Sequence, residues 1–212
     1  MIFILYADVS PLCDDSVFEK YLMSVSGMRR EKAMRCKRRS DRNLSLGAGI
    51  LLGRGLKEFG ISEEETLFSL KKNGKPYIPE HPDISFSISH SGEIAAAAFS
   101  DMEIGCDIEI IAKDRTNIKN RFFAPEESDF VCSDSDFFRI WTLKESYIKA
   151  LGTGLQTPLP SFSVIENGKV KSSIASDDGR IFRFGEFGGI CGYRLSWCAQ
   201  SEDSTKIIKS DL

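Results

Sequence analysis

The sequence predicts an α+β fold of two similar lobes, each an antiparallel sheet packed by helices, related by a pseudo-twofold axis. In each half of the chain, segments with the period of an amphipathic helix come before segments with the alternation of antiparallel strands. The length of 212 residues suits one large domain or two small packed halves. We therefore expect an N-terminal lobe over residues 1–101 and a C-terminal lobe over residues 102–212, which together form one pseudo-dimeric unit.

The N-terminal half begins with a short apolar stretch, Ile2 to Ala7, which predicts a buried strand. Asp14 to Ser24 follows with apolar residues at three- and four-residue steps, which predicts an amphipathic helix. Further along, Leu67 to Ile78 contains the dipeptide Asn73-Gly74 between two short apolar runs. That dipeptide favours a tight turn, so we expect a β-hairpin there.

A longer helix is predicted between these elements. Ser40 or Asp41 can cap its start, its apolar face extends to about Phe59, and Gly60 can end it. Glycines weaken a helix intrinsically, and this helix contains Gly47, Gly49, Gly53 and Gly55. We therefore expect another element to pack closely against its backbone.

The stretch from Arg29 to Arg42 contains eight arginine or lysine residues and only two acidic ones. In a slightly acidic chain this density indicates a local anion-binding surface, although a solvated charged face is equally consistent with it. The stretch has no aromatic residue on which bases could stack. A nucleic acid is therefore not the expected partner.

Residues Ser85 to Glu109 predict a three-stranded antiparallel meander with turns at Ser91-Gly92 and Asp101-Met102. The two faces of its third strand differ in character. One face carries Ile104, Cys106, Ile108 and Ile110, and the other carries Gly105, Asp107 and Glu109. We expect Cys106 to face the core and to serve as packing.

The carboxylates of Asp107 and Glu109 project from the same strand face, roughly 7 Å apart. Two anions placed side by side inside a protein repel each other and need a cation nearby. Oxygen ligands of this kind suit Mg²⁺, which usually takes one or two carboxylates and completes its shell with water and phosphate oxygens. The alternative is a solvated strand face, which antiparallel sheets often present.

The stretch from Phe137 to Leu151 has the strongest helical period in the chain. Ser133 or Asp134 can cap this helix and Gly152 can end it. Lys144 falls within the apolar arc of the helix and therefore needs a buried partner. Glu145 and Lys149 are four residues apart, which is also the spacing of an ordinary surface ion pair.

The rest of the C-terminal half supplies shorter elements. Asp114 to Phe123 and Pro125 to Val131 predict helical pieces, and the second opens with a good N-terminal signature. Phe162 to Ile174 predicts a second Asn-Gly hairpin. Two further strands are expected at Ile181 to Phe187 and at Tyr193 to Ala199, and the polar tail from Ser201 is expected to fray.

Composition places the chain among ordinary globular proteins. Hydrophobic residues make up 42%, charged residues 28%, and the formal net charge is −3. The six cysteines have no CxxC pair and no metal-ligand spacing, which favours reduced thiols. The apolar start lacks a basic segment before it and no apolar run is long enough to cross a bilayer, so we expect a cytoplasmic protein.

Three motifs occur together, in a specific order and at specific separations. They are ISHSG at Ile88 to Gly92, GCDIE at Gly105 to Glu109, and WTLKESYIK at Trp141 to Lys149. With them, most of the chain resembles the 4′-phosphopantetheinyl transferases of the surfactin-synthetase-activator type. The resemblance implies transfer of the phosphopantetheine arm of coenzyme A to a serine of an apo carrier protein (acyl, peptidyl or aryl), with release of adenosine 3′,5′-bisphosphate. The length favours a self-contained two-lobe monomer.

The resemblance also implies roles for individual residues. It makes Asp107, Glu109 and Glu145 the Mg²⁺ ligands. Glu145 would be the base, acting directly or through a metal-bound water, and Lys149 the acid or charge clamp. The expected contacts to coenzyme A are Arg29, Lys32, Arg42, Asn43, Lys75, Ser89, His90 and Lys149. The N-terminal lobe would therefore bind coenzyme A and the C-terminal lobe the metal.

Two other functions are consistent with parts of the pattern. One is a Mg²⁺-dependent hydrolase of phosphoanhydrides, which would keep the metal ligands and change the reaction. The other is a non-catalytic module that uses Arg29 to Arg42 to bind an acidic protein partner. Carrier proteins are typically acidic, so the basic stretch can also be divided between the carrier and the nucleotide.

Overall fold

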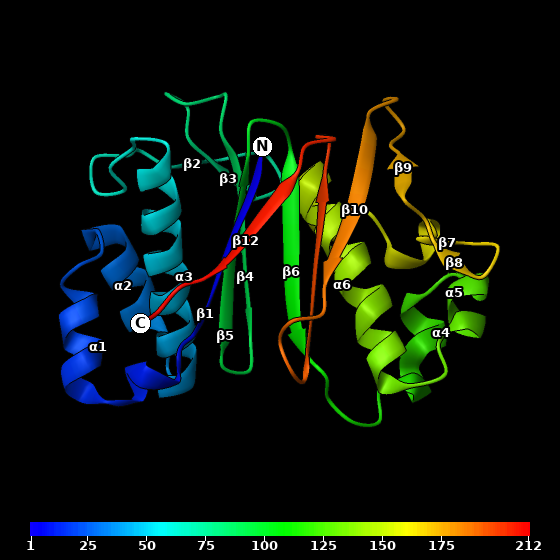
Figure 1. The fold of residues 1–212 in the computed structure, drawn as a ribbon, viewed down its shortest axis with the longest axis horizontal. Helices are drawn as coiled ribbons and strands as arrows, with labels where there is room; N and C mark the ends of the chain where they lie inside the picture. The colour runs from blue at the N-terminus through cyan, green and yellow to red at the C-terminus, as the bar shows by residue number, and fades with distance from the viewer.

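The computed structural model describes residues 1–212, apart from the side chain of Leu155. Two four-stranded sheets stand side by side in the middle of the molecule, with helices on both outer sides (Figure 1). The first sheet consists, in order, of β12 (Thr205–Lys209), β1 (Ile2–Asp8), β5 (Ile94–Ser100) and β4 (Ser85–Ser91). The second consists of β6 (Ile104–Ile110), β11 (Tyr193–Ala199), β10 (Ile181–Phe187) and β9 (Ser173–Ala175).

Each sheet has its own helices. The N-terminal lobe contains the 3-10 helix η1 (Ser10–Cys13), α1 (Asp15–Leu22), α2 (Gly27–Arg35), α3 (Arg39–Glu58) and the small hairpin β2 (Ser69–Leu70) and β3 (Pro76–Tyr77). The C-terminal lobe contains η2 (Thr116–Ile118), α4 (Lys119–Phe122), α5 (Pro125–Phe130), α6 (Asp134–Leu151), η3 (Gly154–Gln156), η4 (Leu159–Ser161) and the hairpin β7 (Ile165–Glu166) and β8 (Lys169–Val170). The predicted α+β fold of two sheet-plus-helix halves is confirmed. None of the described helices is both long and apolar enough to cross a membrane.

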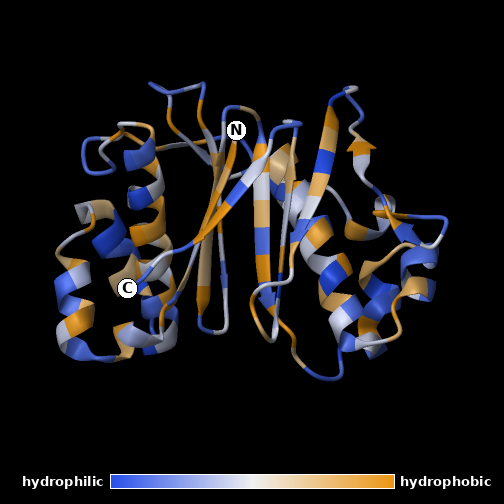
Figure 2. Ribbon diagram, in the orientation of Figure 1, coloured by the Kyte–Doolittle hydropathy of each residue, from blue (hydrophilic) through white to orange (hydrophobic). Residues whose placement is uncertain are grey.

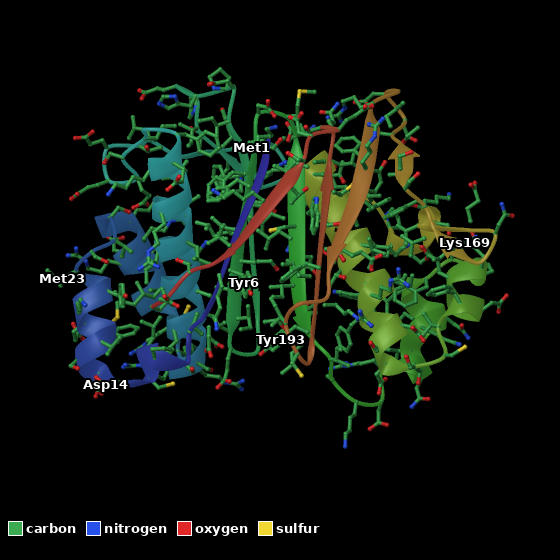
Figure 3. All side chains as sticks on the ribbon, viewed as in Figure 1. Met1, Tyr6, Asp14, Met23, Lys169 and Tyr193 are labelled. Atoms are coloured by element: carbon green, nitrogen blue, oxygen red, sulfur yellow. The ribbon has the colours of Figure 1, made fainter. Side chains whose placement is uncertain are left out.

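The two sheets face each other across a shared apolar layer. Ile4 and Ala96 of the first sheet meet Cys106, Ile108 and other apolar residues of the second. Strands β1 and β5 in the middle of the molecule are mainly orange to pale orange in Figure 2, whereas the outer helices are banded blue and orange. Tyr6 and Tyr193, labelled near the centre of Figure 3, pack against this layer. Cys106 is fully buried there, as predicted.

Helix α3 covers the outer face of the first sheet at very short range. A Cβ atom on Gly47 would lie 2.4 Å from Val9 Cγ1, and one on Gly55 would lie 2.1 Å from Phe99 Cε2. The predicted close packing against this glycine-rich helix is confirmed. Its predicted cap was wrong, because the N-cap is Arg38 and makes no side-chain cap hydrogen bond. Ser40 and Asp41 lie in the first turn instead.

Helix α6 begins and ends where the sequence predicts. The Ser133 side chain accepts a hydrogen bond from the Asp136 backbone N–H, and Gly152 ends the helix with a φ of 69°. The buried partner expected for Lys144 is Glu127 of α5, whose carboxylate oxygens lie 2.7 and 2.6 Å from Lys144 Nζ. Because both side chains are fully buried, this ion pair ties α5 to α6 inside the C-terminal lobe.

The predicted three-stranded meander was wrong in its third strand. β4 pairs with β5, but β6 pairs with β11 in the other sheet. The apolar face of β6 packs across the shared layer instead of extending the first sheet. β6 is joined to β4 by side chains: the backbone N–H groups of Ile104, Cys106, Ile108 and Ile110 donate to the hydroxyls of Ser85, Ser87, Ser89 and Ser91. We call these four serines the serine row.

The C-terminal tail also differs from the prediction. Its residues form β12, which lies parallel to β1 and occupies that strand's outer edge. Arg54 Nη1 donates to Ser210 Oγ over 2.6 Å and to the Asp211 carbonyl over 2.5 Å, which holds the end of the chain on α3. The expected fraying was wrong, because β12 forms backbone hydrogen bonds with the edge of β1 that would otherwise be unpaired. The sheet of the N-terminal lobe therefore includes residues from beyond position 102.

Candidate active site

A cavity of about 480 Å³ lies where the two lobes meet. Helices α2 and α3 and strand β4 contribute one wall, and β6 and α6 contribute the other. Its lining includes charged and polar residues from both lobes: Arg29, Lys32, Ser89, His90, Asp107, Glu109, Glu145 and Lys149. Eight of the eleven site residues predicted from the sequence are thus brought together.

The close approach of β6 and α6 depends on Gly105. A Cβ atom at this position would lie 2.1 Å from the Ser146 carbonyl oxygen and 2.3 Å from the Ala150 nitrogen, both backbone atoms of α6. Strand alternation then directs Asp107 and Glu109 to the same side as Gly105. The acidic strand residues consequently lie beside Glu145 and Lys149 on the same wall of the cavity.

Lys149 and Asp107 form the closest charged pair in the cavity. Lys149 Nζ lies 2.6 Å from Asp107 Oδ1 and 3.0 Å from Ser89 Oγ. Burial lowers the pKa of Lys149, but the charge and hydrogen bond of Asp107 together with the charges of Cys106 and Glu145 outweigh it, and the net effect is a raised pKa. The other carboxylate oxygen, Asp107 Oδ2, is buried and has no hydrogen-bond partner among the described residues.

Glu109 and Glu145 are held in conditions that disfavour their charge. Burial is the main cause of the raised pKa of Glu145, and the neighbouring Asp107 adds to it. The pKa of Glu109 is also raised by burial and by Asp107, against an opposing hydrogen bond from Ser91. A nearby cation would relieve this cost for both carboxylates.

The three carboxylates offer a donor set that fits Mg²⁺. All are oxygen ligands, one buried oxygen is unpartnered, and two of the groups have raised pKa values. Within the described residues, no three Asp, Glu, His or Cys side chains already stand close enough to hold a metal ion. Ligation by all three therefore requires their side chains to draw together.

The opposite wall of the cavity is positively charged. Arg29 Nε lies 3.5 Å from Glu63 Oε1 but makes no hydrogen bond within the described chain, and burial lowers the pKa of this guanidinium. Burial and then the charge of Arg29 lower the pKa of Lys32. The pKa of His90 is lowered by burial and then by the charges of Lys149 and Lys32. This wall is suited to binding an anion.

Comparisons with known proteins agree with this chemistry. The family model of the 4′-phosphopantetheinyl transferase superfamily matches residues 103–199. A 4′-phosphopantetheinyl transferase of Bacillus subtilis is 36% identical over 76% of this chain and 75% of its own length. The transferase Sfp of Bacillus subtilis strain 168 is 32% identical over 87% of this chain and 86% of its own length. The chain belongs to the 4′-phosphopantetheinyl transferase superfamily. The resemblance carried by the three motifs is confirmed, and this enzyme transfers 4′-phosphopantetheine from coenzyme A to carrier proteins.

Three residues assigned to coenzyme A lie outside the lining of the transferase's charged cavity. Arg42 Nε donates to the Cys36 carbonyl over 2.8 Å. Asn43 is buried and accepts a hydrogen bond from Arg39 Nε over 3.1 Å. Lys75 Nζ lies 2.6 Å from Glu103 Oε2 and donates to two backbone carbonyls. Their contacts with coenzyme A stay predictions.

A second cavity of about 490 Å³ adjoins the first in the transferase. The two cavities share Ile88, Glu145 and Lys149, and Lys75 lines the second one. Its lining is mainly apolar, with Phe86, Pro76 and Ile148 among its residues. Lys75 therefore lines a different cavity from Arg29 and Lys32, although all three were predicted to contact coenzyme A.

Sequence reasoning missed Trp141 and Ser45 as residues of the transferase cavity. Trp141 begins the motif WTLKESYIK and lies one helical turn before Glu145, and that spacing was the available signal. Ser45 stands in α3 just after the basic stretch, next to Ala48 on the same wall. No motif distinguishes Ser45 from other helical serines.

Proposed function

We propose that transfer takes place in the charged cavity between the lobes, with Asp107, Glu109 and Glu145 as Mg²⁺ ligands. The observation that supports this is the convergence of these carboxylates with Lys149 on one wall, opposite Arg29 and Lys32 on the other. When bound, Mg²⁺ would neutralise charge on the pyrophosphate of coenzyme A. The acceptor is a serine hydroxyl of an apo carrier protein, and the leaving group is adenosine 3′,5′-bisphosphate.

Glu145 is the proposed base. It accepts the proton of the carrier serine hydroxyl while the serine oxygen forms a bond to the phosphorus next to the pantetheine arm. Its carboxylate lines the cavity beside Asp107 and Lys149 and can accept the proton there. Trp141, one turn earlier on α6, lines the same cavity and helps to exclude water from it.

Lys149 is the proposed acid or charge clamp. The pyrophosphate P–O bond breaks as the new bond forms, and negative charge collects on the departing phosphate oxygen. The raised pKa of Lys149 keeps its ammonium protonated, so that it stabilises this oxygen or donates a proton to it. Its hydrogen bond to Asp107 Oδ1 sets its position in the cavity.

The basic wall is the proposed site for the 3′-phosphate of coenzyme A. Arg29, Lys32 and His90 all have lowered pKa values, so a phosphate dianion would relieve their mutual repulsion and burial. Ser89 lies between this wall and Asp107. We keep Lys75, Arg42 and Asn43 as predicted contacts to coenzyme A. They lie outside the charged cavity, so coenzyme A would have to extend beyond it to touch them.

The carrier protein is proposed to approach the basic surface of α2 and the start of α3. Acidic carriers and a basic docking surface attract each other at long range, which speeds encounter. We also propose a monomer, since both walls of the cavity come from one chain. All six cysteines occur as free thiols, in keeping with the proposed cytoplasmic location.

The direct test is incubation with coenzyme A and an apo carrier protein, followed by mass spectrometry of the carrier. Transfer adds the mass of phosphopantetheine to the carrier, whereas hydrolysis of coenzyme A leaves the carrier mass unchanged. Asp107→Ala and Glu109→Ala should remain folded and lose transfer, and EDTA should stop the wild-type enzyme. Full activity in either variant, or undiminished activity in EDTA, would contradict the proposed site.

A further inference from the structure

The last residue of the serine row lies against one of the proposed metal ligands. Ser91 Oγ is 2.5 Å from Glu109 Oε2, and it accepts a hydrogen bond from the Ile110 backbone N–H over 3.2 Å. Because this hydroxyl oxygen accepts the backbone hydrogen, its own hydrogen is free to point at the carboxylate. Ser91 therefore donates a charge-assisted hydrogen bond to Glu109.

The same arrangement occurs two residues earlier in the serine row. Ser89 Oγ accepts a hydrogen bond from the Ile108 backbone N–H over 3.3 Å and donates to Asp107 Oδ1 over 2.8 Å. Each serine thus hydrogen-bonds both to a carboxylate of β6 and to the backbone N–H of the next residue in β6. Both serines belong to β4 of the N-terminal lobe, whereas the carboxylates belong to β6 of the C-terminal lobe.

Ser91 is itself held in place by a turn that both lobes support. It pairs with Ile94 at the end of the β4–β5 ladder, and Gly92 makes the turn with a φ of 59°. A Cβ atom on Gly92 would lie 2.4 Å from Tyr193 Oη, and the Glu93 backbone N–H donates to that hydroxyl over 2.9 Å. The Ser91 hydroxyl therefore has little freedom to move relative to β6.

We propose that Ser91 is a positioning residue that orders the Glu109 carboxylate for metal binding during phosphopantetheinyl transfer. The inference rests on the proposed metal site. A glutamate side chain loses rotamer freedom when it becomes a ligand, and a hydrogen bond formed beforehand reduces that loss. Groups that hold a metal ligand from behind typically change metal affinity by about 10- to 100-fold when removed.

The serine row provides a matched control for this test. Ser87 Oγ accepts a hydrogen bond from the Cys106 backbone N–H over 3.0 Å, but it hydrogen-bonds to no carboxylate of the described chain. Ser87→Ala and Ser91→Ala therefore both remove a bond between β4 and β6. Only Ser91→Ala also removes a bond to Glu109. Ser91→Thr keeps the hydroxyl and serves as the conservative variant.

The experiment measures Mg²⁺ dependence in two ways for the full-length enzyme. Transfer rates are recorded against Mg²⁺ concentration, and Mg²⁺ binding is measured by calorimetry with coenzyme A present and no carrier. Ser91→Ala should raise both the half-saturating Mg²⁺ concentration and the dissociation constant by about 10-fold or more, with kcat at saturating Mg²⁺ largely kept. Ser91→Thr should restore both values, and Ser87→Ala should leave both unchanged.

Two results would overturn the inference while leaving the metal site intact. Wild-type Mg²⁺ dependence in Ser91→Ala would show that Glu109 needs no ordering by Ser91. Equal shifts in Ser87→Ala and Ser91→Ala would show that the serine row acts only as a joint between the lobes. Glu109→Ala separates this failure from failure of the metal site: if Glu109→Ala keeps wild-type Mg²⁺ binding, the proposed ligand itself is wrong, and the role of Ser91 falls with it.

Discussion

Lys149 Nζ of α6 lies 2.6 Å from Asp107 Oδ1 of β6, so the motif GCDIE and the motif WTLKESYIK meet in one ion pair. The aspartate of this pair is buried, with Asp107 only 4% exposed. It connects the proposed acid of the reaction to a proposed metal ligand. A change at Lys149 should therefore reduce turnover, and it should also lower stability, because it leaves the Asp107 carboxylate without its cation.

Lys149→Met should reduce kcat by about 100-fold or more, because a positioned charge on the leaving oxygen is lost. The measurement is the initial rate of carrier modification at saturating coenzyme A. Lys169→Met is the control, since Lys169 is exposed on the β7–β8 hairpin and is labelled at the far side of the C-terminal lobe in Figure 3. Wild-type kcat in Lys149→Met would remove this residue from the mechanism.

Gly105→Ala should destabilise the enzyme by at least about 2 kcal/mol, because the new Cβ would lie against backbone atoms of α6 that cannot rotate away. Urea denaturation measures the change. Gly188→Ala is the control, since a Cβ at Gly188 would meet nothing within 4 Å and should change stability by less than about 0.5 kcal/mol. Equal stability of both variants would mean that β6 and α6 are less closely packed than described.

Lys144→Met should destabilise the enzyme by about 3 kcal/mol or more, because it leaves the Glu127 carboxylate buried without its cation. Glu127 also accepts hydrogen bonds from the Ala124 and Val164 backbone N–H groups, both at 2.8 Å. The double variant Lys144→Met with Glu127→Gln removes the charge and keeps an acceptor, so it should recover part of the loss. Urea denaturation of both variants tests this, and no recovery would argue against an electrostatic cause.

Glu145→Gln should stabilise the metal-free enzyme at neutral pH while abolishing transfer. Burial, followed by the charge of Asp107, raises the pKa of Glu145, so the folded protein holds this proton more tightly than the unfolded chain does. Ionisation of Glu145 therefore costs stability as pH rises from the unfolded pKa of about 4.3 through the raised value. Glutamine carries no charge and avoids that cost.

The check on Glu145→Gln is urea denaturation in EDTA at pH 4 and at pH 7.5. The stability difference from wild type should be small at the lower pH and positive at the higher one. Glu80→Gln, a change at an exposed glutamate, should show no such pH-dependent gain. A Glu145→Gln variant that is less stable than wild type at both pH values would mean that the charge is not strained in the folded protein.

Much of the site was predictable from local sequence pattern. The alternation around Gly105 places Asp107 and Glu109 on one strand face, and the helical period places Glu145 and Lys149 one turn apart. The buried lysine of α6 predicted a partner without naming it, because Glu127 comes from a separate helix and only tertiary packing brings it close. Local periodicity predicts which face of a helix or strand a residue lies on, but not which residue of another element packs against it.

The features that were missed depend on long-range contacts. The side-chain bonds between β4 and β6 leave no alternation or turn signal, so a continuous meander was the natural prediction. β12 pairs with β1 across almost the whole chain length, and a short polar tail gives no local sign of this. The inward direction of Asn43 follows from its contacts with Arg39 and Cys13, which the sequence pattern does not contain.

Metal binding by the variant Glu145→Gln tests the central claim most directly, because Glu145 alone of the three carboxylates comes from α6. Mn²⁺ can replace Mg²⁺ as the probe, and its binding can be followed by electron paramagnetic resonance with coenzyme A present and carrier absent. We predict that Asp107→Ala, Glu109→Ala and Glu145→Gln each weaken Mn²⁺ binding by about 10-fold or more, while Glu80→Gln does not. Wild-type Mn²⁺ affinity in Glu145→Gln would contradict a metal site shared between β6 and α6.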